Sequence, residues 1–172
     1  MSNLIYDLWA SYSPAYRAIK RDDELSLDNC ISCSNYHLRM KNLLTDAFDI
    51  HYLTGYKLLE MIVKFDAVRC MSLMMQKYKY IIRPPLINEV LKHDSYRILN
   101  YFIENDIDIV DNALMTALRN DSSYCLELMY SKCLVDASMI WSMKDLLLTT
   151  VACYGFWLSV VKPTISKPRS RL

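Results

Sequence analysis

The residues best suited to chemistry lie close together near Cys30. Cys30 and Cys33 form a C-x-x-C pair, and His37 follows four residues later. Thiolate and imidazole are the ligands that zinc prefers, and such a pair can hold one ion from a single turn of chain. The second half of the site is incomplete, because His51 would have to fold back from the next segment. We therefore expect ordinary reduced thiols and no cofactor, with a zinc site and a redox pair as the alternatives.

Enzymatic catalysis is not predicted. No serine lies in a nucleophile elbow, and no histidine has a recognisable catalytic partner. The chain has only two glycines, Gly55 and Gly155, whereas phosphate-binding loops and dinucleotide fingerprints need several closely spaced ones. The acidic stretch "DIDIVDN" at 106–112 lacks the central glycine and the terminal glutamate of a calcium-binding loop. We expect a protein that is not an enzyme.

The composition indicates a small globular protein rather than a nucleic-acid-binding one. The 172 residues are 53% apolar, which is enough for the core of one domain or one short array of repeats. The net charge is +1, from 20 basic and 19 acidic residues that are interspersed, so no strong field attracts nucleic acid. The first ten residues lack a basic region followed by an apolar one, so we expect no secretory signal, reduced cysteines and a cytoplasmic location.

A similar phrase occurs three times in the chain. The three copies are "KFDAVRCMSLMMQ" at 64–76, "KHDSYRILNYFIE" at 92–104 and "RNDSSYCLELMYS" at 119–131. Their aspartates, Asp66, Asp94 and Asp121, are 28 and 27 residues apart. A fixed period of this length is typical of stacked supersecondary units.

Each unit is predicted to contain two helices with a polar break between them. In the middle copy, "PLINEVLK" at 85–92 and "SYRILNYFIEN" at 95–105 both place apolar residues on one helical face, and Leu91, Ile98, Leu99 and Phe102 are expected in the core. Asp94 in the break is expected to cap the second helix. Asn105 is expected to end it in the left-handed conformation.

The stretch "ILNYFIENDIDIVDNALMTALRND" at 98–121 resembles the outer helix, loop and following inner helix of ankyrin repeats. The period of 27 to 28 is shorter than the usual value of about 33, and "PPLI" and "DNAL" stand where the family has "TPLH". Degeneracy of this kind is similar to that of ankyrin-like proteins of large DNA viruses, such as poxviruses and the multigene families of African swine fever virus. The resemblance implies a role in host range or against host defence, with a host or viral protein as partner, in the host cytoplasm.

The predicted fold is all-α: a short ankyrin-like helical solenoid of three clear repeats, with one candidate degenerate repeat on each side. Asn35 and Asp145 would take the position of Asp94 in these flanking copies. The predicted organisation is a capping helix at 1–24, the repeat array at 25–145, an apolar terminal helix at 146–161 and a basic flexible tail at 162–172.

The connectors between repeats are the predicted protein-binding surface, because solenoids bind through successive loops. The simpler interpretation is that opposite charges on adjacent connectors only attract one another and set the register in which neighbouring repeats stack. The candidate partner-binding residues are Tyr78, Lys79, Tyr80 and Arg83 in one connector and Asp106, Asp108 and Asp111 in the next.

The segment Leu146 to Val161 contains sixteen residues without a charge. As one helix it would span about 24 Å, less than the roughly 30 Å of a hydrocarbon core. We expect a buried helix that closes the stack. The alternative is a tail-anchored helical protein of an intracellular membrane, such as a viral apoptosis regulator, because basic residues follow the segment.

Overall fold

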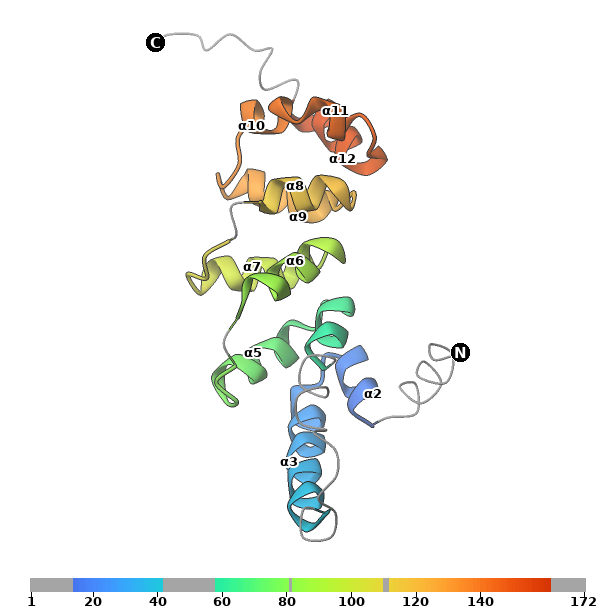
Figure 1. Cartoon of the computed structure of the whole chain (residues 1–172), viewed down its shortest axis with the longest axis vertical. Coiled ribbons are helices and arrows are strands. Elements are labelled where there is room, and N and C mark those ends of the chain that lie inside the picture. The colour runs from blue at the N-terminus through green and yellow to red at the C-terminus, as the bar shows by residue number, and fades with distance from the viewer. Residues whose placement is uncertain (1–13, 42–57, 81, 110–111, 162–172) are drawn as a thin grey trace. The chain divides into compact units, whose positions relative to one another are not determined.

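The computed structural model describes residues 14–41, 58–80, 82–109 and 112–161, and all regular secondary structure in these ranges is helical (Figure 1). The prediction of an all-α fold is therefore confirmed. The chain divides into two compact units, Met1–Ile82 and Arg83–Leu172.

The first unit contains two helix pairs. Helices α2 (Pro14–Lys20) and α3 (Glu24–Lys41) form one pair, and the helical residues 58–64 precede α5 (Val68–Gln76) in the other. Helix α3 packs against both α2 and α5. The core of this unit is apolar and almost fully buried, and includes Ile19, Leu27, Leu59, Ile62 and Met71.

The second unit contains three further pairs arranged in two layers. The first two pairs are α6 (Pro84–Lys92) with α7 (Tyr96–Glu104) and α8 (Ala113–Arg119) with α9 (Ser123–Ser131). The last consists of α10 (Ala137–Ser142) and α11 (Lys144–Leu147) followed by α12 (Val151–Phe156) and the π-helical turn η1 (Trp157–Val161). Inner helices α6, α8 and α11 contact one another in succession, as do outer helices α7, α9 and α12.

The apolar stripes of these helices form the core, as the sequence predicts. Leu91, Ile98, Leu99 and Phe102 have no exposed surface. Burial of such a stripe supplies most of the stability of a short helix, because a nine-residue helix is marginal in water by itself.

Aspartate occupies a left-handed conformation in the tight turns. Asp22, Asp66, Asp94 and Asp121 have φ values of 53°, 49°, 53° and 54°. Asp is one of the few residues besides glycine that tolerates this region, which explains how the chain makes these turns with so few glycines. The prediction for Asn105 is wrong, because its φ is −107°. The next residue, Asp106, is the left-handed one, with φ 54°.

The flanking helix pairs lie elsewhere than the sequence predicts. Asn35 is inside α3 and Asp145 is inside α11, so neither is in a turn. The turn of the first pair contains Asp22, inside the segment predicted as a capping helix. The turn of the last pair contains Thr149 and Thr150. Helix pairing therefore begins earlier than residue 25 and extends beyond residue 145.

The apolar segment 146–161 is not the single helix that was predicted. Helix α11 ends at Leu147, α12 begins at Val151, and η1 begins at Trp157. The buried Thr150 hydroxyl donates to the carbonyl of Leu147 at 2.9 Å, which stabilises the break. Among the residues that the structure describes, no helix is both long enough and apolar enough to cross a membrane.

Candidate interaction surface

The turn aspartates connect one helix pair to the next. The Asp94 carboxylate accepts hydrogen bonds from the backbone N–H groups of Tyr124 at 3.2 Å and Cys125 at 2.8 Å. Both groups lie in the first turn of α9, where backbone N–H groups have no partner within the helix. The prediction that Asp94 caps the helix that directly follows it is wrong, because α7 has Ser95 at its N-cap with no side-chain capping bond. Asp94 caps the outer helix of the following pair instead.

The same arrangement recurs in both units. Asp22 accepts from the N–H groups of Arg69 at 2.8 Å and Cys70 at 3.1 Å, at the start of α5. Asp121 accepts from Ala152 at 3.0 Å and Cys153 at 2.9 Å, at the start of α12. We call these contacts of Asp22, Asp94 and Asp121 the carboxylate ladder. The negative charges also interact favourably with the positive ends of the helix dipoles.

A buried serine adds a second bond between two pairs. The Ser122 hydroxyl donates to the carbonyl of Leu91 in the last turn of α6. Ser122 is 1% exposed, so this bond satisfies a carbonyl group that could not reach water. The pair α6–α7 and the pair α8–α9 are thus linked at two places: Asp94 accepts from the first turn of α9, and Ser122 donates to the last turn of α6.

The contacts of the ladder shift the pKa values of Asp121, Cys153 and Cys70. Partial burial raises the pKa of Asp121, but the N–H groups of Cys153 and Ala152 outweigh it and lower the pKa below its ordinary value. Burial, and then the nearby Asp121 carboxylate, raise the pKa of the Cys153 thiol to about 12. Burial and Asp22 raise the pKa of Cys70 to about 12 in the same way. These thiols are therefore poor nucleophiles and poor metal ligands at neutral pH.

The first outer helix differs from the later ones. Asp23, directly before α3, accepts from the Ser26 N–H at 3.1 Å and from the Ser26 hydroxyl at 2.7 Å. Helix α3 is thus capped by its own preceding residue, whereas α5, α9 and α12 receive their carboxylates from a preceding pair. This local cap fits a helix at the start of a stack.

One predicted binding residue, Tyr78, is used internally. Its hydroxyl donates to Asp28 of α3 at 2.8 Å, and the Lys77 ammonium lies 2.6 Å from the same carboxylate. Lys77 and then Tyr78 hold the pKa of Asp28 below its ordinary value. Tyr78 therefore connects this connector to α3, whereas the neighbouring Lys79 is exposed and Tyr80 is half-buried.

The remaining predicted binding residues lie in the second unit. Arg83, Asp106 and Asp108 are exposed, and Asp111 lies outside the described residues. Glu104 is the last residue of the outer helix α7, and Lys132 directly follows the next outer helix, α9. Their charged groups form an exposed ion pair with a distance of 4.0 Å. Within this unit the connectors after α7 and α9 emerge at one end of the stack, and the tight turns lie at the other (Figure 1).

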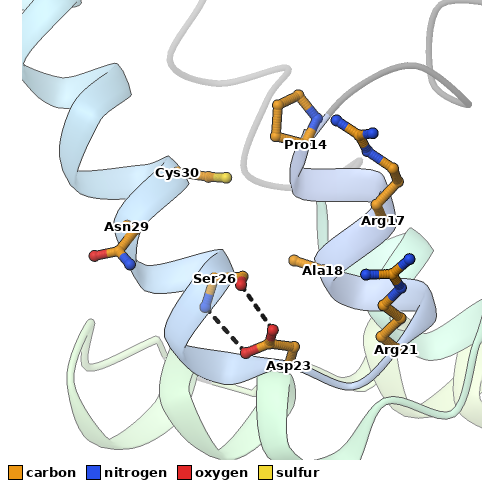
Figure 2. Close-up of a pocket in the computed structure, with 8 residues that line it drawn as sticks. All are labelled: Pro14, Arg17, Ala18, Arg21, Asp23, Ser26, Asn29 and Cys30. Atoms are coloured by element: carbon orange, nitrogen blue, oxygen red, sulfur yellow. Dashed lines mark hydrogen bonds between the residues drawn. The ribbon is translucent and has the colours of Figure 1, made fainter.

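Cys30 lines a cavity of about 320 Å³ between α2 and α3 (Figure 2). Its thiol is directed toward α2, which contributes Arg17 to the cavity, and Arg21 lies in the turn directly after α2. The Asp23 carboxylate at the cavity wall is already engaged with Ser26. Cys33 and His37 belong to α3, but their side chains lie outside the described residues. Within the part of the chain that the structure describes, no group of three or more His, Cys, Asp or Glu side chains is placed to hold a metal ion.

Comparison of the chain with protein families, curated proteins and solved structures finds no match. The assignment of function therefore depends on the geometry of the chain itself.

A cysteine that recurs four residues after a turn position is the feature of the sequence from which the ladder could have been predicted. Cys125 and Cys153 lie four residues after the turn positions Asp121 and Thr149, and Cys70 lies four residues after Asp66. All three are fully buried, and their N–H groups donate to carboxylates of a preceding pair. A small apolar residue at this position lets the carboxylate approach the helix end closely.

Proposed function

We propose that the chain is a non-enzymatic protein-interaction module: a short ankyrin-like solenoid that binds a partner protein through its connectors. The observation that carries this proposal is the carboxylate ladder, which holds successive helix pairs in a constant register. Because the pairs repeat in register, the connectors of the second unit emerge at one end and form a continuous edge.

The chemistry of this connector edge favours a basic partner surface. Glu104 and Lys132 are 57% and 40% exposed in their side chains, and Asp106 and Asp108 are also exposed. Leu134 adds an apolar side chain that is 43% exposed. Acidic groups around an apolar contact suit protein recognition, in which charges set orientation and association rate while apolar anchors supply most of the affinity.

The biological role proposed is that implied by the resemblance to degenerate ankyrin-like proteins of large DNA viruses. In that role the chain acts in the host cytoplasm, on a host or viral protein, and alters host range or host defence. The described residues give no support to a catalytic role: the thiols of Cys70 and Cys153 have raised pKa values, and the carboxylates of the ladder serve as helix caps.

The test is affinity capture with the tagged full chain, followed by titration with the purified partner. The connector variant is Asp106→Asn with Asp108→Asn. The matched control is Lys92→Ala with Arg119→Ala, which changes two exposed charges at the opposite, tight-turn end of the same unit. Both should fold normally, because none of the four side chains is buried.

We expect the connector variant to weaken the Kd at least ten-fold and the control variant to leave it unchanged. Equal binding by wild type and connector variant would contradict the proposed edge. Absence of any saturable protein partner from infected and uninfected host extracts would contradict the proposed function itself.

A further inference from the structure

The cavity between α2 and α3 is bordered by positive charges. Arg17 and Arg21, four residues apart, both line it, and both side chains are exposed. The same two arginines line an adjoining hollow of about 460 Å³ together with Lys20, which is also exposed. None of these three cations forms an ion pair with another residue that the structure describes. Their charges are therefore not neutralised by a salt bridge within the described part of the chain.

The carboxylates nearest to these cations in the sequence are already engaged. Asp22 accepts from the N–H groups at the start of α5, as part of the carboxylate ladder. Asp23 accepts from the hydroxyl and the N–H of Ser26, which, more than Arg21, hold the pKa of Asp23 below its ordinary value. Because both carboxylates have hydrogen-bond donors of their own, the arginines can serve an anion from outside the chain.

Figure 2 shows how the cavity is built. Both arginine side chains extend toward Pro14 at the start of α2, whereas the acidic wall residue Asp23 lies at the other end, beyond the end of α2. The α3 wall is uncharged at Ser26 and Cys30. The volume of about 320 Å³ is in the range of small-molecule sites. The Pro14 end of the cavity is therefore the place for an anion.

Two guanidinium groups suit a phosphate group better than a carboxylate. Each guanidinium is a planar fork of N–H donors that keeps its charge at every physiological pH. A carboxylate has two oxygens, which a single fork satisfies. A phosphate monoester has three terminal oxygens and close to two negative charges at neutral pH, so it can accept from both forks. The uncharged α3 wall suits a neutral organic group attached to the phosphate.

We propose that the cavity between α2 and α3 binds a small organic phosphate. Arg17 and Arg21 hold the phosphate group, and the α3 wall at Ser26 and Cys30 faces the organic part. A hollow of this size within one helix pair suits a small molecule, whereas a phosphorylated protein segment needs a longer groove. The site is independent of the connector edge, because all its residues lie in the first unit.

The test is isothermal titration of the full chain with glycerol 3-phosphate at low salt, with glycerol as the uncharged control ligand. The site variant is Arg17→Gln with Arg21→Gln. The matched control variant is Arg83→Gln with Arg119→Gln, which removes two arginines of the second unit. All four side chains are exposed, so both variants should fold, and thermal melting by circular dichroism checks this.

Cys30 supplies a second readout that needs no variant. Its thiol lines the cavity, so a bound ligand should slow its alkylation by iodoacetamide. The exposed Cys133 of the second unit is the internal reference, whose rate should not change. Timed labelling with and without glycerol 3-phosphate, followed by peptide mass spectrometry, measures both rates.

We expect saturable binding of glycerol 3-phosphate, no binding of glycerol and slower alkylation of Cys30 at saturation. The site variant should weaken the Kd at least about ten-fold, because charge-assisted hydrogen bonds are lost, and the control variant should leave it unchanged. No saturable binding, equal weakening by both variants, or an unchanged Cys30 rate at saturation would overturn the proposal. Tighter binding of a short phosphoserine peptide than of glycerol 3-phosphate would also overturn it, and would assign the cavity to a phosphorylated protein.

Discussion

At the scale of single residues, an aspartate in one helix pair forms a hydrogen bond with a cysteine in the following helix pair. The carboxylate of Asp22 or Asp121 accepts from the N–H group of a buried cysteine, Cys70 or Cys153, in the following pair. N–H groups hold the pKa of Asp121 below its ordinary value, and the nearby aspartate raises the pKa of each of the two thiols. Two side chains that look reactive in the sequence are thus structural.

The first prediction concerns thiol reactivity. At pH 8, Cys70 and Cys153 should resist iodoacetamide in the folded protein, because they are fully buried and have pKa values of about 12. Cys133 is exposed and should be alkylated quickly. Peptide mass spectrometry after timed labelling measures each site, with urea-unfolded protein as the control. Equal labelling of Cys153 and Cys133 in the folded protein would contradict the placement of Cys153.

The second prediction concerns pH. The pKa of Asp121 is lowered in the folded state, so its contribution to stability is present above the unfolded value of about 3.9 and is lost as the pH falls through the lower folded value. The free energy of unfolding should therefore fall from pH 5 toward pH 2.5. Urea titrations across this range should show a smaller fall for Asp121→Asn than for wild type. Asp108→Asn is the control, and an equal change in both variants would contradict the role of Asp121.

At the scale of elements, each short helix depends on its neighbours. Helices α6 and α7 have nine residues each, and α8 has seven, so their intrinsic stability in water is low. Their apolar stripes meet in the core, and the Leu91 carbonyl in the last turn of α6 accepts from the Ser122 hydroxyl of the next pair. A single truncation in the stripe should therefore destabilise the whole unit.

The third prediction tests this dependence. Phe102 is among the largest fully buried side chains, so Phe102→Ala should lower the free energy of unfolding by about 3 to 5 kcal/mol. Tyr124→Ala is the control and should change it by less than about 0.5 kcal/mol, since Tyr124 is 63% exposed. Urea denaturation followed by circular dichroism measures both. A wild-type midpoint for Phe102→Ala would show that α7 does not pack through this side chain.

At the scale of the whole molecule, the sequence predicts the all-α fold, the core stripes and three of the turns. It does so because apolar spacing and recurring aspartates are local signals. The first pair was missed because the 18-residue α3 lengthens the spacing from Asp22 to Asp66 and hides the period. The break of 146–161 was missed because the threonines that make it are compatible with a helix. The direction of the aspartate caps depends on contacts between residues about 30 apart, which no local pattern encodes.

The candidate site was predictable only in part. Charge and position correctly indicate exposed side chains at Lys79, Arg83, Asp106 and Asp108. The internal role of Tyr78 was not predictable, because its partner Asp28 lies 50 residues earlier in the chain. The exposure of Leu148, Val151 and Leu158 was not predictable, because a run without charges is equally typical of a buried helix.

The most direct test of the account is amide hydrogen exchange in Asp94→Ala compared with Asp106→Ala. Both residues have the same left-handed backbone, with φ values of 53° and 54°, but only Asp94 caps α9. We predict that the Tyr124 and Cys125 amides exchange about ten-fold faster in Asp94→Ala, as expected for loss of a cap of about 1.4 kcal/mol, and remain unchanged in Asp106→Ala. Faster exchange at the start of α7, with Tyr124 and Cys125 unchanged, would show that Asp94 caps its own pair and would contradict the ladder.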